Sequence, residues 1–195
     1  MKEFIKKNIF QIIIVLVFFS IFIILILGSL NTSTPKINMG VNTQRGEVSI
    51  SAPENSDFIL KNIDGNELQL SKYLGRPVVL DFWSSWCGPC IQEAQILSDA
   101  YIEWSSEGVE FIGIAIWDNE QNIKAFKDKY NIQYNIAMDN SGRTAVDFGI
   151  VAVPEKFFIY SDGSFAFKIN GPNNKDSLDG YIVRLLNEDK KTNEH

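Results

Sequence analysis

The stretch Val78-Val79-Leu80-Asp81-Phe82-Trp83-Ser84-Ser85-Trp86-Cys87-Gly88-Pro89-Cys90 decides the fold. Its first half, Val78–Trp83, is apolar except for one acid and is typical of a strand covered on both faces. Cys87 and Cys90, the only cysteines among 195 residues, come next, and a helix-like stretch follows, Ile91–Trp104. A strand, a C-x-x-C pair and then a helix is the context in which such a pair indicates redox chemistry.

Zinc binding is one alternative for a C-x-x-C pair. Zinc needs four protein ligands in a structural site and three in a catalytic one. The sequence has no second cysteine pair, and its single histidine is the last residue, His195. The sequence therefore predicts no metal site. The alternative to redox chemistry at Cys87 and Cys90 is a structural disulfide, or two inert core thiols.

The spacing assigns a role to each cysteine. Cys87 is expected just before the first helical turn, where free N–H groups and the helix dipole favour a thiolate. As the attacking thiolate it should also be exposed. Cys90 is expected one turn inside the helix, close to Cys87 but less accessible. Pro89 suits an early helical position, because its missing N–H would be unpaired there.

The segment Val79–Cys90, which includes Trp86, Gly88 and Pro89, resembles the active-site segment of thioredoxin. From about residue 57 to about residue 187 the chain is similar to the membrane-anchored thioredoxin-like reductases of the ResA/TlpA/DsbE group. The resemblance implies an α/β, thioredoxin-like fold, with a central mixed sheet flanked by helices. It also implies a thiol–disulfide oxidoreductase whose redox-active disulfide, Cys87–Cys90, is its only redox group, with no other cofactor.

Asp81 interrupts the apolar strand, and a buried acid is costly unless it is paired or protonated. It lies six residues before Cys87, where thioredoxin carries its buried aspartate. The resemblance implies that Asp81 takes or gives the proton of Cys90 during exchange. The anchored reductases often have asparagine at this position, so at Asp81 the chain resembles thioredoxin more than it resembles them. The alternative is a solvated side chain at the edge of the sheet.

Residues 150–159 form a second functional stretch, in which Pro154 opens an apolar strand. In the thioredoxin fold the matching proline is cis and packs against the C-x-x-C pair. The resemblance also implies that the backbone of Val153, the residue before this proline, is free to pair with an extended substrate peptide. Glu155 after the proline is a feature of the DsbE branch, and we include it among the candidate substrate-binding residues. A trans proline is the alternative.

The other predicted elements alternate between strands and helices, which favours parallel pairs in the sheet. The N-terminal hairpin spans 58–63 and 67–70, and a helix-containing insert follows the second strand. The further predictions are a helical turn at 71–75, strands at 109–116, 136–138 and 164–170, and helices from 118 or 119 to about 130, 141–148 and 174–187.

The N-terminus predicts a membrane anchor. Residues 9–27 are apolar except for Gln11 and Ser20, which is long enough to span a bilayer. Lysines precede the run and none follows until Lys36, so the positive-inside rule places the N-terminus in the cytoplasm. The resulting domains are 1–29 as cytoplasmic stub and anchor, 30–56 as flexible linker, 57–187 as the thioredoxin-like domain and 188–195 as polar tail. A cleaved signal peptide is the alternative.

The composition excludes several functions. A net charge of −6 argues against a nucleic acid partner. A catalytic Ser-His-Asp or Cys-His pair is impossible within a domain that has no histidine. A peroxidase motif of the form P-x-x-x-T-x-x-C would need proline and threonine at the positions of Leu80 and Ser84.

The resemblance also implies partners for an extracytoplasmic, single-pass protein of the cell membrane. A transmembrane thiol carrier of the CcdA/DsbD type would supply electrons, and a disulfide-containing envelope protein such as apocytochrome c would receive them. Two alternatives stay open. One is a reductase that serves spore-envelope or methionine sulfoxide repair proteins, and the other is a binding or assembly module without turnover.

Overall fold

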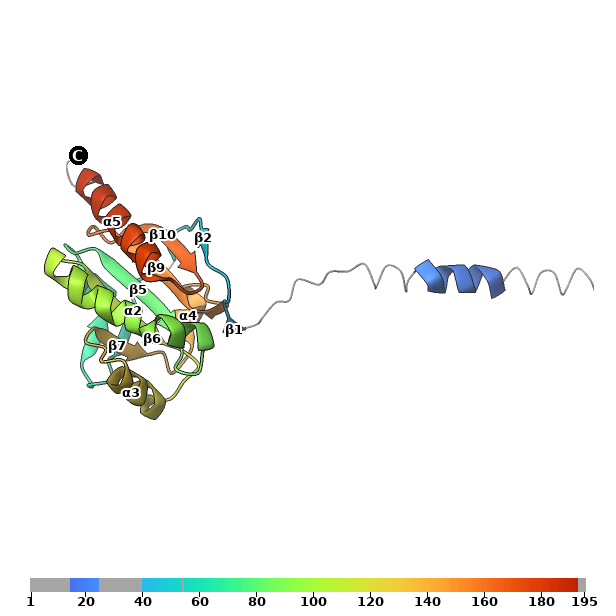
Figure 1. Ribbon diagram of the computed structural model, residues 1–195, viewed down its shortest axis with the longest axis horizontal. Coiled ribbons are helices and arrows are strands. Elements are labelled where there is room, and N and C mark those ends of the chain that lie inside the picture. Colours follow the sequence, from blue (N-terminus) through green and yellow to red (C-terminus); the bar gives the residue numbers. More distant parts are fainter. Residues whose placement is uncertain (1–14, 25–39, 54, 193–195) are drawn as a thin grey trace, which may run out of the picture. The chain divides into compact units, whose positions relative to one another are not determined.

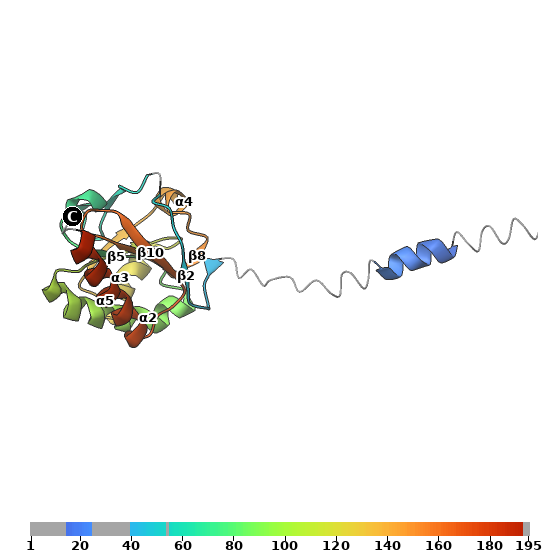
Figure 2. The same ribbon diagram turned by 90° about the horizontal axis from the view of Figure 1, so that it is seen from above.

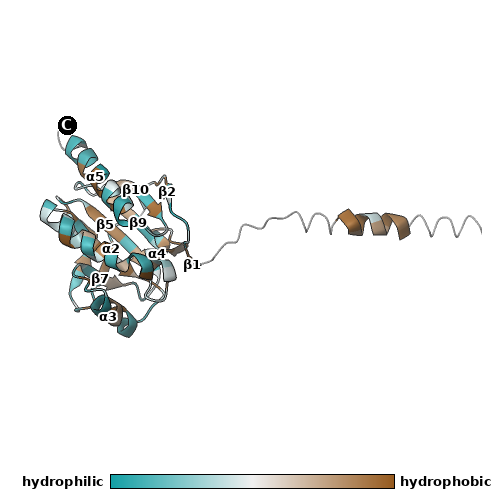
Figure 3. Ribbon diagram, in the orientation of Figure 1, coloured by the Kyte–Doolittle hydropathy of each residue, from teal (hydrophilic) through white to brown (hydrophobic). Residues whose placement is uncertain are grey.

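The computed structural model describes residues 15–24, 40–53 and 55–192 (Figure 1). The chain divides into two compact units, residues 1–37 and 38–195. In the first unit, residues 15–24 form an exposed helix that is hydrophobic along nearly its whole length (Figure 3). The predicted anchor, residues 9–27, lies partly outside the described residues. No helix within the described ranges is long and apolar enough to cross a membrane.

The second unit is built on a mixed sheet with the strand order β2-β10-β9-β5-β6-β7. Strand β5 pairs in parallel with β6, which pairs in parallel with β7, whereas β9 runs antiparallel to β5 and β10, and β10 antiparallel to β2. The bounds are β2 Gly46–Val48, β5 Val78–Trp83, β6 Glu110–Ala115, β7 Asn135–Met138, β9 Glu155–Ile159 and β10 Phe165–Asn170. Alternating strands and helices thus give the predicted α/β arrangement with a mixed central sheet.

Helices cover both faces of this sheet (Figure 2). Helices α2 (Gly88–Trp104) and α5 (Lys175–Thr192) lie on one face, where Trp104 Nε1 donates a hydrogen bond of 2.9 Å to Asp179 Oδ1. Helix α3 (Glu120–Lys129) packs at the edge of that face. Helix α4 (Arg143–Asp147) lies on the opposite face. There Phe148, the residue after α4, packs on Phe82 of β5 with ring centroids 5.2 Å apart.

Strand β5 is the centre of the core, and all six of its residues are buried. Burial of one large apolar side chain contributes about 1.5–3 kcal/mol, so this strand anchors both layers. Asp81 faces the α2 side of the sheet and Phe82 faces the α4 side, because successive strand residues point to opposite faces. Strand β5 therefore delivers Asp81 beneath α2 and ends immediately before the C-x-x-C loop.

The remaining predicted elements are present, with ends shifted by a few residues. The N-terminal hairpin forms a separate two-stranded antiparallel sheet from β3 (Ile59–Lys61) and β4 (Glu67–Gln69). A 3-10 helix follows at Leu70–Tyr73, where a helical turn is predicted. Helix α3 is capped by Asn119, whose side chain accepts a hydrogen bond of 2.9 Å from Asn122 N.

The prediction of a flexible linker over residues 30–56 is wrong for residues 40–48. Strand β1 (Gly40–Val41) pairs in parallel with β8 (Ala152–Val153), and β2 pairs with β10 as the edge of the main sheet. The polar, aperiodic composition of this segment gave no strand signal apart from a short run around residue 47. The pairing arises because the open backbone edges of β8 and β10 supply its hydrogen bonds.

The prediction of a polar tail from residue 188 is also wrong in part, because α5 continues to Thr192. Glu188 accepts a hydrogen bond of 2.7 Å from the hydroxyl of Tyr160, and Asp189 accepts one of 2.7 Å from Ser161 N. These contacts to the turn after β9 hold the last turns of the helix against the domain. They depend on tertiary packing, which the polar composition of the segment does not reveal.

We predict that Gly113→Ala destabilises the domain, because Gly113 of β6 faces a crowded part of the core. A Cβ added there would lie 2.9 Å from Trp83 Nε1 and 3.2 Å from Tyr134 Cε2. The expected loss is about 1–3 kcal/mol in the free energy of unfolding, measured with urea. Gly180→Ala is the control, since Gly180 lies in α5 with no neighbour within 4 Å of an added Cβ. It should stabilise by about 0.5–1 kcal/mol. Equal effects would contradict the packing argument.

Candidate active site

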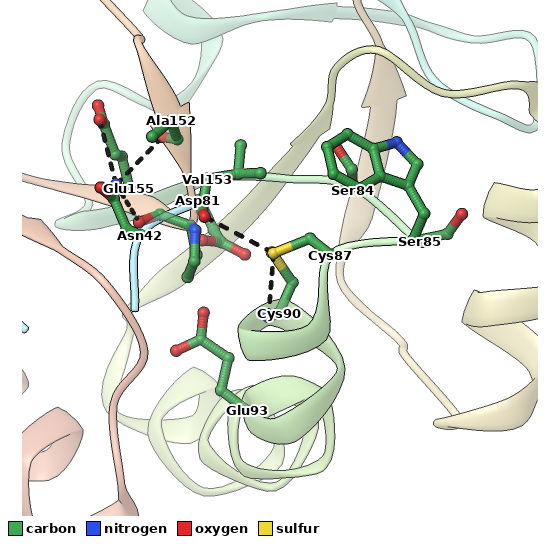
Figure 4. The surroundings of a disulfide bond; sticks show 12 residues. Asn42, Asp81, Ser84, Ser85, Cys87, Cys90, Glu93, Ala152, Val153 and Glu155 are labelled. Atoms are coloured by element: carbon green, nitrogen blue, oxygen red, sulfur yellow. Dashed lines mark hydrogen bonds between the residues drawn. A yellow bond between two sulfur atoms is a disulfide. The ribbon is translucent and has the colours of Figure 1, made fainter. Parts of the chain in front are cut away.

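The candidate active site is the Cys87–Cys90 disulfide at the start of α2, with Cα atoms 5.2 Å apart (Figure 4). Cys87 is the N-cap of the helix, and its Sγ accepts a hydrogen bond of 3.3 Å from Cys90 N. Pro89 lies in the first turn as predicted. Free N–H groups at a helix start stabilise negative charge, so this position favours a thiolate on Cys87 when the pair is reduced.

Three hydrogen bonds hold the loop between β5 and the disulfide. Ser84 Oγ donates to Ile116 O over 2.6 Å, and Trp86 Nε1 donates to Trp117 O over 2.9 Å. Ser85 N donates to Asp118 Oδ2 over 2.6 Å. All three acceptors belong to the segment after β6, so the β5–β6 pairing fixes the position of the motif. The indole of Trp86 is about half exposed, and Gly88 is exposed beside it.

The predicted second stretch does meet the disulfide. The peptide bond between Val153 and Pro154 is cis, as the resemblance implied. The carbonyl oxygen of Val153 lies 3.6 Å from Cys87 Sγ, within reach of a thiol hydrogen in the reduced protein. Cys87 and Val153, 66 positions apart in sequence, are thereby brought together, because β9 pairs antiparallel with β5 and carries Pro154 to the end of the sheet where α2 begins.

The prediction that Cys87 is exposed and Cys90 more hidden is wrong. The exposed fraction is 0% for Cys87 and 3% for Cys90. The physical reason is tertiary: the Val153–Pro154 loop lies against Cys87, and strand β1 lies on that loop in turn. The N-cap position itself, which the sequence predicted correctly, leaves the sulfur accessible only if nothing packs over it.

Asp81 is buried on the α2 side of the sheet, so the alternative of a solvated edge position is wrong. Burial raises the pKa of its carboxyl, and the neighbouring Lys156 opposes the rise. Its Oδ1 lies 3.4 Å from Lys156 Nζ and makes no hydrogen bond within the described residues. Figure 4 shows Asp81 and Glu93 reaching from β5 and α2 toward the same space beside the disulfide.

This buried cluster has two further members that the sequence did not indicate, Glu93 and Lys156. Lys156 Nζ donates to Glu93 Oε1 over 2.5 Å, and Glu93 Oε2 accepts from Asn173 N over 2.8 Å. Burial raises the pKa of Glu93 to about 7, against the lowering effect of Lys156. Helical spacing was an available signal, since Glu93 lies three residues after Cys90 and therefore on the same face of α2.

Glu155, expected to bind substrate, is fully buried. Its Oε2 lies 2.5 Å from Lys168 Nζ of β10, and its Oε1 accepts a hydrogen bond of 3.3 Å from Asn42 Nδ2. The side chain thus faces β10 and the residue after β1, and it does not reach an open surface. Asn42 lies beside the cis-proline loop, and the sequence did not indicate this contact.

The fold and the site together define a thiol–disulfide oxidoreductase with a thioredoxin-like architecture. Three features support this class: a C-x-x-C disulfide at a helix start, a cis-proline loop that lies against it, and a mixed sheet beneath both. The sequence profile of the AhpC/TSA family matches residues 51–167, more than half of the chain, and the chain belongs to this family. That range includes both cysteines and the cis proline.

Individual relatives agree with this class. The thiol-disulfide oxidoreductase ResA of Oceanobacillus iheyensis is 31% identical over 149 residues, which cover 74% of this chain and 76% of the relative. ResA of Bacillus thuringiensis subsp. konkukian is 27% identical over 142 residues, which cover 73% and 80%. A secreted Mycobacterium tuberculosis disulfide oxidoreductase, homologous to E. coli DsbE, is 27% identical with a TM-score of 0.62, over 68% of this chain and 99% of that one. The predicted resemblance to the ResA and DsbE type is confirmed.

We predict that Asp81→Asn slows the resolving step, in which Cys90 attacks the mixed disulfide on Cys87. The carboxylate accepts the proton of Cys90 only above its own raised pKa, and an unaided thiol ionises near pH ~8.5. The difference in resolving rate between wild type and variant should therefore be largest at pH values between the pKa of Asp81 and that of the thiol. It should vanish above about pH 9. General-base help contributes up to about 10²–10⁴-fold. Stopped-flow measurement of resolution from about pH 6 to about pH 9 tests this.

Asp139→Asn is the matched control for that experiment. Asp81 and Asp139 are each 4% exposed, but Asp139 accepts hydrogen bonds from Ser141 Oγ and from Ala145 N of α4, the helix on the opposite face of the sheet from α2. The control should keep the wild-type pH profile. Identical profiles for wild type and Asp81→Asn would show that Asp81 is structural and takes no part in the chemistry.

Proposed function

We propose that the protein is a membrane-tethered, extracytoplasmic reductase of disulfides in partner proteins. The observation that carries this proposal is the Cys87–Cys90 pair at the start of α2, set against the cis Val153–Pro154 loop. The relatives are thiol–disulfide oxidoreductases, which supports disulfide exchange as the chemistry. The motif residues support reduction of the partner over its oxidation. Gly88-Pro89 between the cysteines matches thioredoxin, whose potential of about −270 mV makes it a reductant.

The reaction proceeds in two exchanges. The Cys87 thiolate attacks one sulfur of the partner disulfide, forms a mixed disulfide and releases the other partner sulfur as a thiolate. Cys90 then loses its proton and attacks Cys87 Sγ, which releases the second partner thiolate and leaves Cys87–Cys90 oxidised. The buried Asp81 accepts the proton of Cys90. The partner gains two electrons, and the domain returns to the reduced state by exchange with a reduced dithiol donor.

The N-terminal sequence supports the location. Residues 9–27 are apolar over a length that spans a bilayer, with Lys2, Lys6 and Lys7 on the side that the positive-inside rule assigns to the cytoplasm. This orientation places the disulfide outside the cytoplasm. A transmembrane thiol carrier of the CcdA/DsbD type is then the electron donor, because cytoplasmic reductants do not reach that compartment.

We propose apocytochrome c, with its haem-attachment cysteines oxidised, as the substrate. The resemblance to the ResA/TlpA/DsbE group supports this choice over other envelope disulfides. The proposal requires that the pair turns over, which separates it from a binding or assembly module.

Cysteine variants test the assignment of roles. Cys87→Ser should abolish reduction of insulin disulfides by the dithiothreitol-reduced protein, because no attacking thiolate remains. Cys90→Ser should leave one attack and a long-lived mixed disulfide, since the resolving thiol is gone. The trapped partner in the native membrane is identified by mass spectrometry. Trapping on Cys87→Ser and none on Cys90→Ser would reverse the roles, and a stoichiometric complex without turnover by wild type would indicate a binding module.

The redox potential tests the direction. Equilibration of the Cys87–Cys90 pair with a glutathione buffer should give a potential nearer about −270 mV than the value of about −120 mV of a strong oxidant. The expectation follows from Gly88-Pro89 and the absence of histidine between the cysteines. A potential above about −180 mV would make the protein an oxidase or isomerase.

A further inference from the structure

The segment after the predicted anchor occupies the backbone edge that a substrate peptide would use. Gly40 of β1 pairs with Ala152 of β8, and Val41 pairs with Val153, in parallel. Asn42 N continues this ladder with a hydrogen bond of 2.7 Å to Val153 O. A peptide that adds to this edge needs the same hydrogen-bonding groups, so it and residues 40–42 cannot bind there together.

The side chain of Asn42 fastens the segment to the cis-proline loop. Its Nδ2 lies within hydrogen-bond distance of three acceptors, Ala152 O and Pro154 O at 3.2 Å and Glu155 Oε1 at 3.3 Å (Figure 4). Glu155 is held in turn by its ion pair with Lys168. One amide side chain thus contacts the residue on either side of Val153 and the buried carboxylate behind it.

The segment also reaches the motif itself. The carbonyl oxygen of Val153 that accepts from Asn42 N is the atom 3.6 Å from Cys87 Sγ. A Cβ added at Gly40 would lie 4.0 Å from Cη2 of Trp86, the residue before Cys87. With this arrangement Cys87 is fully buried, although disulfide exchange requires a partner sulfur to approach it in line.

We propose that residues 40–42 are an intramolecular stand-in for the substrate, which an extended segment of the partner displaces from the β8 edge to reach Cys87. The proposal rests on the proposed function, since it specifies how the same site receives its partner. The stand-in is built to be displaced. Strand β1 has two residues, both only half-buried, and short edge strands open locally at low free energy.

This arrangement sets an affinity and an access rate without changing the chemistry. A partner that binds only the open form has its apparent dissociation constant raised by the reciprocal of the open fraction. The same fraction scales the rate at which a small reagent reaches Cys87. Weakening the Asn42 contacts should therefore lower KM and raise thiol labelling in proportion, while kcat stays the same.

The test compares three variants of the full-length protein in detergent. Asn42→Ala removes the side-chain contacts, and Asn42→Pro also removes the N–H that donates to Val153 O. Thr43→Ala is the matched control, because Thr43 is the next residue and is exposed. Labelling of Cys87 by iodoacetamide is measured in a reduced Cys90→Ser background by mass spectrometry. KM and kcat for insulin disulfides are measured with both cysteines present.

Asn42→Ala should label about five-fold faster than wild type, which corresponds to the loss of one hydrogen bond, and Asn42→Pro faster still. KM should fall by a similar factor, and Thr43→Ala should match wild type. Equal labelling rates and equal KM values in all proteins would overturn the proposal. Asn42→Ala keeps the backbone pairing and remains decisive if the proline variant folds poorly.

Failure of the two proposals can be told apart. If no protein turns over insulin but both Asn42 variants label faster, the proposed reductase function fails and the covering role of residues 40–42 stands. If turnover is normal and the Asn42 variants label and bind like wild type, only the stand-in is wrong.

Discussion

The contact between the Val153–Pro154 loop and the first turn of α2 is the constraint on which the site depends. The loop leads into β9 and the helix follows β5, and the antiparallel pairing of these two strands aligns Phe82 with Glu155. That register places the cis-proline loop opposite the end of β5, where the C-x-x-C loop begins. The oxygen of Val153 then faces Cys87 on one side and accepts from Asn42 N on the other.

Two successive residues of β9 place buried charges on opposite faces of the sheet beside this contact. Lys156 points to the α2 side, between Asp81 and Glu93, and Glu155 points to the other side, toward Lys168 and Asn42. Removing one partner of a buried ion pair costs about 3–5 kcal/mol, because the other charge stays desolvated. One face of the strand therefore holds the buried charges on the α2 side of the sheet, and the other contacts Asn42 of the segment beside the cis-proline loop.

The family match and the covering segment occupy different parts of the chain. The AhpC/TSA profile spans residues 51–167, which contain the disulfide, the cis proline and the cluster around Lys156. Residues 40–42 lie before it and join the site only through the edge of β8. The general chemistry thus belongs to the shared domain, whereas access to Cys87 is controlled by a segment between that domain and the predicted anchor.

The sequence alone determined what local patterns encode. Strand β5, the helix start at Cys87, the start of α3 near residue 118 or 119 and the motif chemistry all follow from neighbours within a few residues, where spacing and capping rules apply. Tertiary structure alone decided the contact of Lys156 with Glu93, 63 residues apart, and of Asn42 with Glu155, 113 residues apart. It also decided that Cys87 is buried. These features depend on strand order and register, which bring together residues that no local periodicity connects.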